Sequence, residues 1–299
     1  MTPLSEPQAE IGVIGGSGFY AMPDLTETET VELSTPFGAP SSPLTIGTLH
    51  GRRVAFLARH GEGHTTLPGE LPAQANIYAL KSIGVERVFS VSAVGSLQQE
   101  LEPLHTVVPD QLIDRTRGRD STFFGDGMVA HIGFADPFCP ALASQLATAG
   151  DRTDVTTHRG GLLVVIEGPA FSTRAESELY RSWGAAIIGM TALPEAKLAR
   201  EAELCYGALC FVTDYDVWHE EEADVSADLI LKNLLHNVES GRAIISATVA
   251  ALPQQRDCDC GDALASALVT APNFVPAETR QRLDLLLRRY RGPADGGGS

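Results

Sequence analysis

The chain has 299 residues, of which 43% are hydrophobic, and this is enough apolar material to bury one large core. Its formal net charge of −16 excludes a nucleic-acid groove, because binding to a phosphate backbone requires a concentrated positive field. The N-terminus has no basic start or apolar stretch, and nowhere do about 18 uncharged apolar residues run together, so we expect a cytoplasmic protein that does not bind a membrane.

Short apolar runs rich in valine and isoleucine alternate with longer amphipathic segments, a pattern typical of a β-sheet covered by helices. The predicted strands, nearly all followed by a glycine-rich or polar loop, are Ile11–Ile14, Arg53–Leu57, Val88–Val91, Leu162–Ile166, Ala186–Ile188 and Leu209–Val212. The predicted helices are Pro72–Ile83, a helix opened by a capping box of Thr173 and Glu176, Leu193–Cys205, Ser226–Val249 and a final helix with Leu283, Leu286, Leu287 and Tyr290 on one face. We therefore expect one α/β domain over residues 11–290, a tail over 1–10 and a disordered tail over 291–299.

Five cysteines are scattered along the chain, at Cys139, Cys205, Cys210, Cys258 and Cys260. They are too few for a disulfide scaffold, and they lack the paired two-residue spacing of a zinc site. Most are therefore expected to be small buried residues. Cys258 and Cys260 flank one aspartate on a predicted loop, where a redox pair is a weaker alternative.

Ligands gather at the carboxyl ends of strands in open α/β sheets, so the loops after the predicted strands form the candidate site. The first loop, Gly15–Gly18, lets backbone amides approach an anion, and its spacing is not that of a dinucleotide fingerprint. The second carries Arg59 and His60, which are donors suited to phosphate. The third, Ser92–Ser96, adds a hydroxyl and small residues. Each loop alone also fits an ordinary role as a tight turn, a surface ion pair or a close packing contact.

The later loops offer aromatic, thioether and carboxylate groups. Phe171, in a rigid turn, is suited to stacking on a base, and a core phenylalanine fits it equally well. Met190 and Thr191 follow another strand, where a methionine is usually core packing. Asp214 and Asp216 follow the last strand and point to the same side of an extended chain. In a shared dry site at least one of their pKa values should rise, whereas a helix cap or a solvated turn is the ordinary alternative.

Segments from about Ile11 to Val249 together resemble the 5'-methylthioadenosine phosphorylases of the trimeric purine nucleoside phosphorylase family. They are IGVIGGSG, LARHGEGH, AQANIYAL, SAVGSL, EGPAFSTRAES, GMTALPEAKLAREAELCY and TDYDVWH. The resemblance implies one domain with a mixed central sheet, a homotrimer with active sites at subunit interfaces, and a pentosyltransferase of purine and methionine salvage. This enzyme would convert 5'-methylthioadenosine and phosphate to adenine and 5-methylthioribose 1-phosphate. Residues after Pro253 match less well, and Cys258 and Cys260 resemble the C-x-C of some archaeal members in which disulfides occur.

The resemblance also implies roles for single residues. Phosphate would be bound by Ser17, Arg59, His60, Ser92, Ala93 and Thr191. Met190 would lie against the ribose, and the base would be bound by Phe171, Ser172, Asp214 and Asp216. The 5' substituent would contact Ala227, Ile230, Leu231 and, from a neighbouring subunit, His131. Ala227 stands where a larger aliphatic residue is common, so a roomier pocket is expected, and Ser17 and Ser92 replace threonines but keep the hydroxyl.

The chemistry fits these roles. Cleavage of an N-glycosidic bond needs an anionic nucleophile for the sugar and a proton for the leaving purine. Phosphate is the nucleophile and co-substrate, and protonated Asp214 is expected to donate to N7, so no metal or cofactor is expected. An adenine amino group donates a hydrogen bond and suits a carboxylate, whereas a 6-oxo group needs a donor. The family's 6-oxopurine enzymes carry glutamate and asparagine where Ser172 and Asp214 stand here, so both residues favour adenine.

Three alternatives stay open at this point. The first is a sister phosphorylase acting on 5'-methylthioinosine or another 6-oxopurine nucleoside, which the identity of the released base would reveal. The second is a non-catalytic nucleoside-binding protein, against which intact Arg59, His60, Asp214 and Asp216 argue. The third is a hydrolase that uses water, which would leave Arg59 without an evident purpose.

Overall fold

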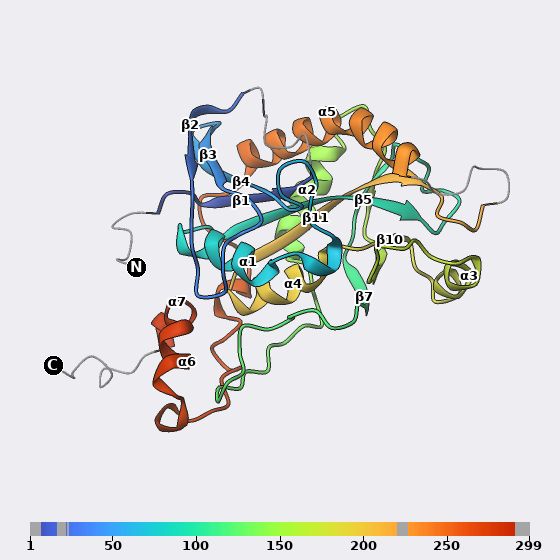
Figure 1. Ribbon diagram of the computed structural model, residues 1–299. Coiled ribbons are helices and arrows are strands. Elements are labelled where there is room, and N and C mark those ends of the chain that lie inside the picture. Colours follow the sequence, from blue (N-terminus) through green and yellow to red (C-terminus); the bar gives the residue numbers. More distant parts are fainter. Residues whose placement is uncertain (1–6, 17–21, 23, 220–226, 291–299) are drawn as a thin grey trace.

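A mixed β-sheet runs through the middle of the computed structural model, with helices packed on both of its faces (Figure 1). The structure describes residues 7–16, 22, 24–219 and 227–290, and within these ranges eleven strands join the sheet. The strands are β1 Ile11–Gly15, β2 Thr26–Val31, β3 Leu44–Leu49, β4 Arg52–Ala58, β5 Arg87–Ser96, β6 Thr106–Val108, β7 Gln111–Arg115, β8 Thr157–Arg159, β9 Leu162–Ile166, β10 Ile187–Gly189 and β11 Cys205–Asp214. The predicted α/β fold in a single domain with a mixed sheet is confirmed.

Seven α-helices accompany the sheet in the same described ranges. They are α1 Ala73–Ser82, α2 Pro140–Gly150, α3 Arg174–Ser182, α4 Ala192–Glu201, α5 Ala227–Ala251, α6 Ala277–Arg282 and α7 Asp284–Leu287. Short 3-10 helices lie at Pro68–Glu70, Asp259–Asp262, Pro272–Phe274 and Arg288–Tyr290. Within the described helices, none is long and apolar enough to cross a membrane.

Parallel pairing brings the carboxyl ends of four strands to one edge of the sheet. β1 pairs in parallel with β4 and with β5, and β5 pairs in parallel with β11. β10 runs antiparallel to the end of β5, with Ile188 opposite Gly95. The loops that follow β1, β4, β5 and β11 therefore emerge close together, and this is the edge at which α/β folds place their ligands.

The two faces of the sheet carry separate apolar clusters. Successive side chains of a strand point to opposite faces, so neighbouring Val13 and Ile14 of β1 belong to different clusters. The cluster that holds Ile14 includes residues of α1 and α4, whereas the cluster that holds Val13 includes residues of α2 and α5. Both faces are thus covered, which explains why the central strands are continuous apolar runs.

Helix ends agree with the predictions where a local signal sets them. The capping box that opens α3 is confirmed, since the Thr173 Oγ1 accepts from the Glu176 N–H at 3.2 Å and the Glu176 carboxylate accepts from the Thr173 N–H at 2.8 Å. The first residue of α1 is Ala73, so Pro72 lies one position before the helix and not in its first turn as predicted. The helix predicted to reach Cys205 ends at Glu201 instead, because Glu203 adopts a positive φ of 58° and Cys205 begins β11.

The sequence patterns did not predict six elements, which are β2, β3, β6, β7, β8 and α2. β2 reads TETETV and is exposed at the sheet edge, so it lacks the apolar signal of a buried strand. The predicted last helix is divided at Leu283 into α6 and α7, although Leu283, Leu286 and Leu287 are buried together as expected.

The last residues of the predicted N-terminal tail pack on the fold. Ala9 is buried, and the N–H of Gln8 donates to the Ile83 carbonyl at 2.8 Å. Glu10 forms a two-pronged ion pair with Arg52 at 2.7 and 2.8 Å. The predicted C-terminal tail, residues 291–299, lies outside the described residues.

Candidate active site

The predicted phosphate-binding loops converge. The Arg59 N–H donates to the Gly15 carbonyl at 2.9 Å, which joins the loop after β4 to the end of β1. The Arg59 Nη1 donates to the Val91 carbonyl at 2.8 Å, directly before Ser92. The Ser92 and Thr191 hydroxyls lie 3.2 Å apart, although 99 residues separate them in the chain. Ala93 is the next residue of the same strand, and Ser17 lies outside the described residues.

Arg59 is the best-held side chain of this cluster. It is only 2% exposed and forms an ion pair with equally buried Glu195, with Nε at 2.5 Å and Nη2 at 3.1 Å from the carboxylate. Its Nη2 also donates to the Ser90 hydroxyl at 2.7 Å. The ion pair provides a structural purpose for Arg59 without phosphate, so the argument against a hydrolase that rests on this residue fails. One N–H of Nη1 is not used by these bonds.

His60 is neutral at physiological pH. Burial lowers its pKa to about 4, and neighbouring Arg59 adds to this effect. Its Nδ1 lies 2.9 Å from the Thr66 carbonyl, which can only accept, so Nδ1 carries the proton. The Nε2 is then an acceptor, and the His64 ring stacks on His60 with 4.1 Å between centroids. In this state the Nε2 of His60 can only accept a hydrogen bond, which differs from the donor role expected from the sequence.

Asp214 and Asp216 form a buried acidic pair at the end of β11. Asp214 Oδ2 accepts from the Thr213 hydroxyl at 2.7 Å, and its Oδ1 accepts from the Asp216 N–H at 2.8 Å. Burial raises the pKa of Asp214, against the hydrogen bond from Thr213. Burial also raises the pKa of Asp216 to about 6, and the Asp214 charge adds to it. The prediction that at least one pKa rises is confirmed, and the alternative of a solvated turn is wrong.

Two polar atoms of the predicted base site have no hydrogen-bond partner in the described part of the chain. They are the Asp216 Oδ2 and the Ser172 Oγ, both buried. The Ser177 hydroxyl interacts with the Asp216 carboxylate and lowers its pKa, so the protein itself places one donor group beside Asp216. A buried polar atom without a partner costs free energy, so the Ser172 hydroxyl points to a ligand that pairs with it. Gly95 of β5 lies against the acidic pair, because an added Cβ would come within 2.9 Å of the Asp214 Oδ1.

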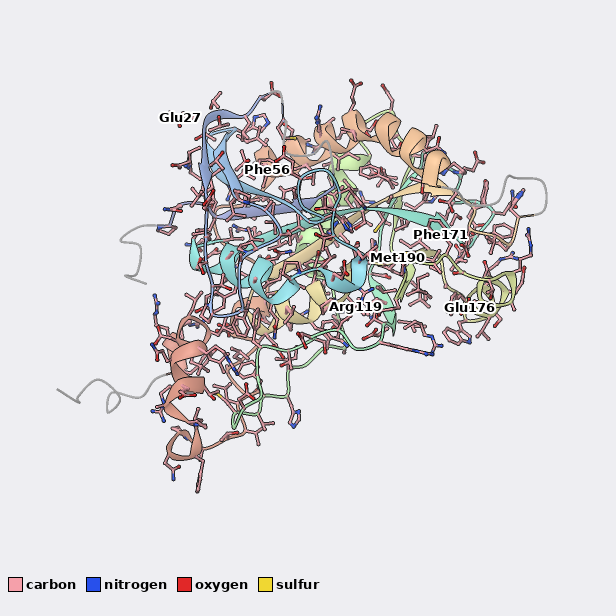
Figure 2. The ribbon with its side chains drawn as sticks, in the orientation of Figure 1. Glu27, Phe56, Arg119, Phe171, Glu176 and Met190 are labelled. Atoms are coloured by element: carbon pink, nitrogen blue, oxygen red, sulfur yellow. The ribbon has the colours of Figure 1, made fainter. Side chains whose placement is uncertain are left out.

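The predicted base contact Phe171 lies on the loop after β9, and the predicted ribose contact Met190 lies on the loop after β10. Phe171 is 41% exposed, so the alternative of a core phenylalanine is wrong. Met190 packs across Gly168, since a Cβ there would lie 2.6 Å from the Met190 Sδ. Figure 2 shows Met190 and Phe171 at the side of the molecule where β10 and α3 lie.

Arg119, which the sequence interpretation missed, joins these two loops. Its Nη1 donates to the Met190 carbonyl at 2.7 Å, and its Nε pairs with Glu167 at 3.1 Å. Glu195 was also missed, although it stands in the quoted segment GMTALPEAKL. A glutamate among apolar helix residues is a signal for a buried partner, but its identity depends on the fold.

The residues predicted for the 5' substituent fall in two places. Ala227, Ile230 and Leu231 are on α5, and their side chains lie outside the described residues. Farther along α5, the Asn233 Nδ2 donates to the Thr213 carbonyl at 2.7 Å, which brings this part of the helix to the end of β11. His131 is exposed, and its N–H donates to the Ala267 carbonyl at 2.8 Å. His131 therefore lies beside the C-terminal segment rather than on the loops after β5, β10 and β11.

We expect Asp216→Asn to make the protein more stable at high pH. Because the pKa of the folded protein's Asp216 is raised from 3.8 to about 6, the ionised carboxylate destabilises the fold as pH rises through this range. Asparagine removes the charge and tolerates the positive φ of 53° at this position. The gain over the unmodified protein should be near zero at pH 4 and about 1–3 kcal/mol at pH 8. Urea unfolding at both pH values measures it, and a gain independent of pH would contradict the assigned pKa.

Comparisons with known proteins identify the family of the chain. Residues 10–250 match the phosphorylase superfamily. The chain is 54% identical over 290 residues to the S-methyl-5'-thioadenosine phosphorylase of Koribacter versatilis, covering 97% of this chain and 99% of that protein. It is 56% identical over 286 residues to the protein of the same name from Thermosynechococcus vestitus, with 94% and 99% covered.

Solved structures give the same result. A methylthioadenosine phosphorylase from an antarctic soil metagenomic library aligns with a TM-score of 0.90 and 50% identity, covering 94% of this chain and 100% of that one. The methylthioadenosine phosphorylase of Schistosoma mansoni, solved in complex with adenine, aligns with a TM-score of 0.81 and 34% identity, covering 86% and 96%. The resemblance inferred from the sequence motifs is confirmed.

Proposed function

The chain belongs to the phosphorylase superfamily, among the S-methyl-5'-thioadenosine phosphorylases, and from this premise we propose that it cleaves S-methyl-5'-thioadenosine with inorganic phosphate. The products are adenine and 5-methylthioribose 1-phosphate. The reaction is a pentosyl transfer from a purine to phosphate, and it serves purine and methionine salvage. Relatives that carry this name and match nearly the whole chain support the assignment.

The proposal rests on where two groups lie along one strand: the hydroxyl and arginine cluster that would bind phosphate, and the acidic pair that would bind the base. On β5, Ser92 lies opposite Cys210 and beside Thr191, whereas Gly95 lies opposite Asp214. Three residues of a strand span about 10 Å, so the hydroxyl and arginine cluster and the acidic pair lie about one nucleoside apart. A phosphate at the first and a purine at the second would leave the sugar carbon between them.

Each residue of the site then has its own role in the reaction. Arg59, Ser92 and Thr191 hold phosphate, with the Ala93 loop and Ser17 as further contacts, and His60 accepts the phosphate O–H. A phosphate oxygen forms a bond to the sugar C1' while the C1'–N9 bond breaks, and its electron pair moves to the purine. Protonated Asp214 donates its proton to N7 and neutralises the leaving base. The acidic net charge of the protein makes such local donors necessary, because the long-range field repels anions.

Adenine is favoured over hypoxanthine by the polarity of the base site. The Asp216 carboxylate accepts hydrogen bonds, and an exocyclic amino group offers hydrogen-bond donors. The Ser172 hydroxyl can donate or accept and so suits either base. A 6-oxo group would face an acceptor instead, and such a mismatch costs orders of magnitude in rate. The exposed Phe171 stacks on the purine, and Met190 lies against the ribose.

We further propose a homotrimer in the cytoplasm. His131 of a neighbouring subunit would then complete the site for the 5' methylthio group, beside Ala227, Ile230 and Leu231. The exposure of His131, away from the loops of its own site, favours this intersubunit role. No metal or organic cofactor takes part in the proposed reaction, since phosphate is the co-substrate.

The test is release of free base from S-methyl-5'-thioadenosine, adenosine and inosine, each with and without phosphate. We expect phosphate-dependent adenine release, with the methylthio substrate fastest and inosine at least 100-fold slower, in line with the roughly 10⁴-fold discrimination that hydrogen-bonding sites reach. Base release without phosphate would identify a hydrolase, and faster release of hypoxanthine than of adenine would identify a 6-oxopurine enzyme. Release of no base from any substrate would identify a non-catalytic nucleoside-binding protein.

A further inference from the structure

Four of the five cysteines meet in space although they come from three separate parts of the chain. Cys139 precedes α2, Cys205 begins β11, and Cys258 and Cys260 lie at the 3-10 helix after α5. Their sulfur atoms all lie within 4.8 Å of one another, and the Cys205 and Cys258 sulfurs are 3.3 Å apart. All are free thiols, and three of the four residues are buried.

This cluster has the size of a tetrathiolate metal site. Zinc binds thiolate sulfur at about 2.3 Å, so the sulfurs of a tetrahedral site lie about 3.8 Å from one another. The observed sulfurs need only small side-chain adjustments to reach this spacing. The sequence interpretation rejected zinc because no two-residue spacing is repeated, but spacing along the chain does not limit ligands that tertiary folding brings together.

Positive groups surround the sulfurs. The Arg200 Nη1 lies 4.0 Å from the Cys260 sulfur, and Arg256 interacts electrostatically with Cys205 and Cys258. Gly261 leaves room for Arg256, because a Cβ there would come within 2.7 Å of its Nη2. A divalent ion with four thiolates carries a net charge of −2, and the two guanidinium groups reduce it, although Arg256 also pairs with Glu86 at 3.5 Å. Such outer donors are typical partners of metal-bound thiolates.

The cluster lies far from the chemistry. Cys205 is the first residue of β11 and Asp214 the last, and nine residues of a strand span about 30 Å. The cluster instead joins the segment after α5 to the sheet and to α2. Its position therefore fits a structural site that holds the C-terminal segment in place, and it does not depend on the proposed reaction.

We propose that Cys139, Cys205, Cys258 and Cys260 bind one structural Zn²⁺ ion. The four thiols release their protons to solvent as the four sulfur–zinc bonds form, and no electron is transferred. Four protein ligands close the coordination shell, so no position remains for water or substrate. The fifth cysteine, Cys210, is buried elsewhere on β11 and takes no part.

The first test is metal content and thiol count of the full chain purified without chelator. We expect about one zinc per chain by elemental analysis, and five free thiols after denaturation in chelator. A chain without metal that has lost four thiols to disulfides would overturn the proposal in favour of oxidised pairs. A chain with five thiols that binds neither added Zn²⁺ nor Co²⁺ at micromolar concentration would overturn it as well. Iron in place of zinc would overturn the choice of metal.

Variants and cobalt locate the ion. Cys258→Ser, at the least buried ligand, should lose most of the zinc, whereas the matched Cys210→Ala should keep it. Co²⁺ added to the metal-free chain should produce the strong visible absorption of a tetrahedral tetrathiolate, and Zn²⁺ should remove it. This spectrum is read from the unmodified chain, so the test holds even if a variant fails to fold. Equal zinc in Cys258→Ser and Cys210→Ala would contradict the assignment.

Discussion

Asp214→Asn is expected to lower the rate of adenine release by about 10²- to 10⁴-fold, the range that general acid catalysis contributes. The amide keeps the size of the side chain and still accepts from the Asp216 N–H, but it has no acidic proton for N7. Phosphate affinity should change little, because Ser92, which lies beside Thr191, is three residues along β5 from Gly95, the residue opposite Asp214. Steady-state rates with S-methyl-5'-thioadenosine and phosphate binding by calorimetry measure the two effects.

A leaving group that needs no proton separates a catalytic from a structural role. A nitrophenyl riboside releases nitrophenolate as such a leaving group, and the variant should cleave it at nearly the rate of the unmodified enzyme. Asp114→Asn is the matched control, since Asp114 pairs with Lys197 on the partly exposed surface. Equal losses of adenine release and phosphate affinity in Asp214→Asn would refute the assigned role, and so would an equal loss with both substrates.

Glu195→Ala is expected to destabilise the protein by about 3–5 kcal/mol, the cost of leaving one partner of a buried ion pair alone. Glu195 and Arg59 have side chains only 2% exposed. The substitution leaves the Arg59 charge uncompensated, and the Tyr206 hydroxyl loses the carboxylate that accepts from it at 2.9 Å. The free energy of unfolding in urea, measured at one protein concentration, reports this loss.

Glu178→Ala provides the comparison for Glu195→Ala. Glu178 pairs with Arg181 on α3, and their side chains are 60% and 33% exposed, so its loss should cost at most about 1 kcal/mol. If the two variants lose the same stability, the buried pair does not hold the site. If Glu195→Ala is folded and active but has a raised KM for phosphate only, Glu195 acts by positioning Arg59.

The local signals in the sequence determined much of this protein. The apolar runs located the six central strands, because strands covered on both faces are continuously hydrophobic. The capping box at Thr173 was predictable because its hydrogen bonds lie within four residues. The alternation of Asp214 and Asp216 at a strand end indicated a shared acidic site. Motifs read in order then identified the family, since all of them except AQANIYAL, which lies in α1, include a strand end or the loop after it.

Only the tertiary structure decided which distant groups meet. The Arg59 and Glu195 pair, 136 residues apart in the chain, and the meeting of Cys139 with Cys205, Cys258 and Cys260 depend on how the strands are ordered and how the last segment packs. The same is true of the pKa of His60 and Asp216, which burial sets. Sequence patterns report the periodicity of single elements, whereas contact and desolvation arise between elements, and this is the physical reason why the site's charges and the cysteine cluster became visible only in the fold.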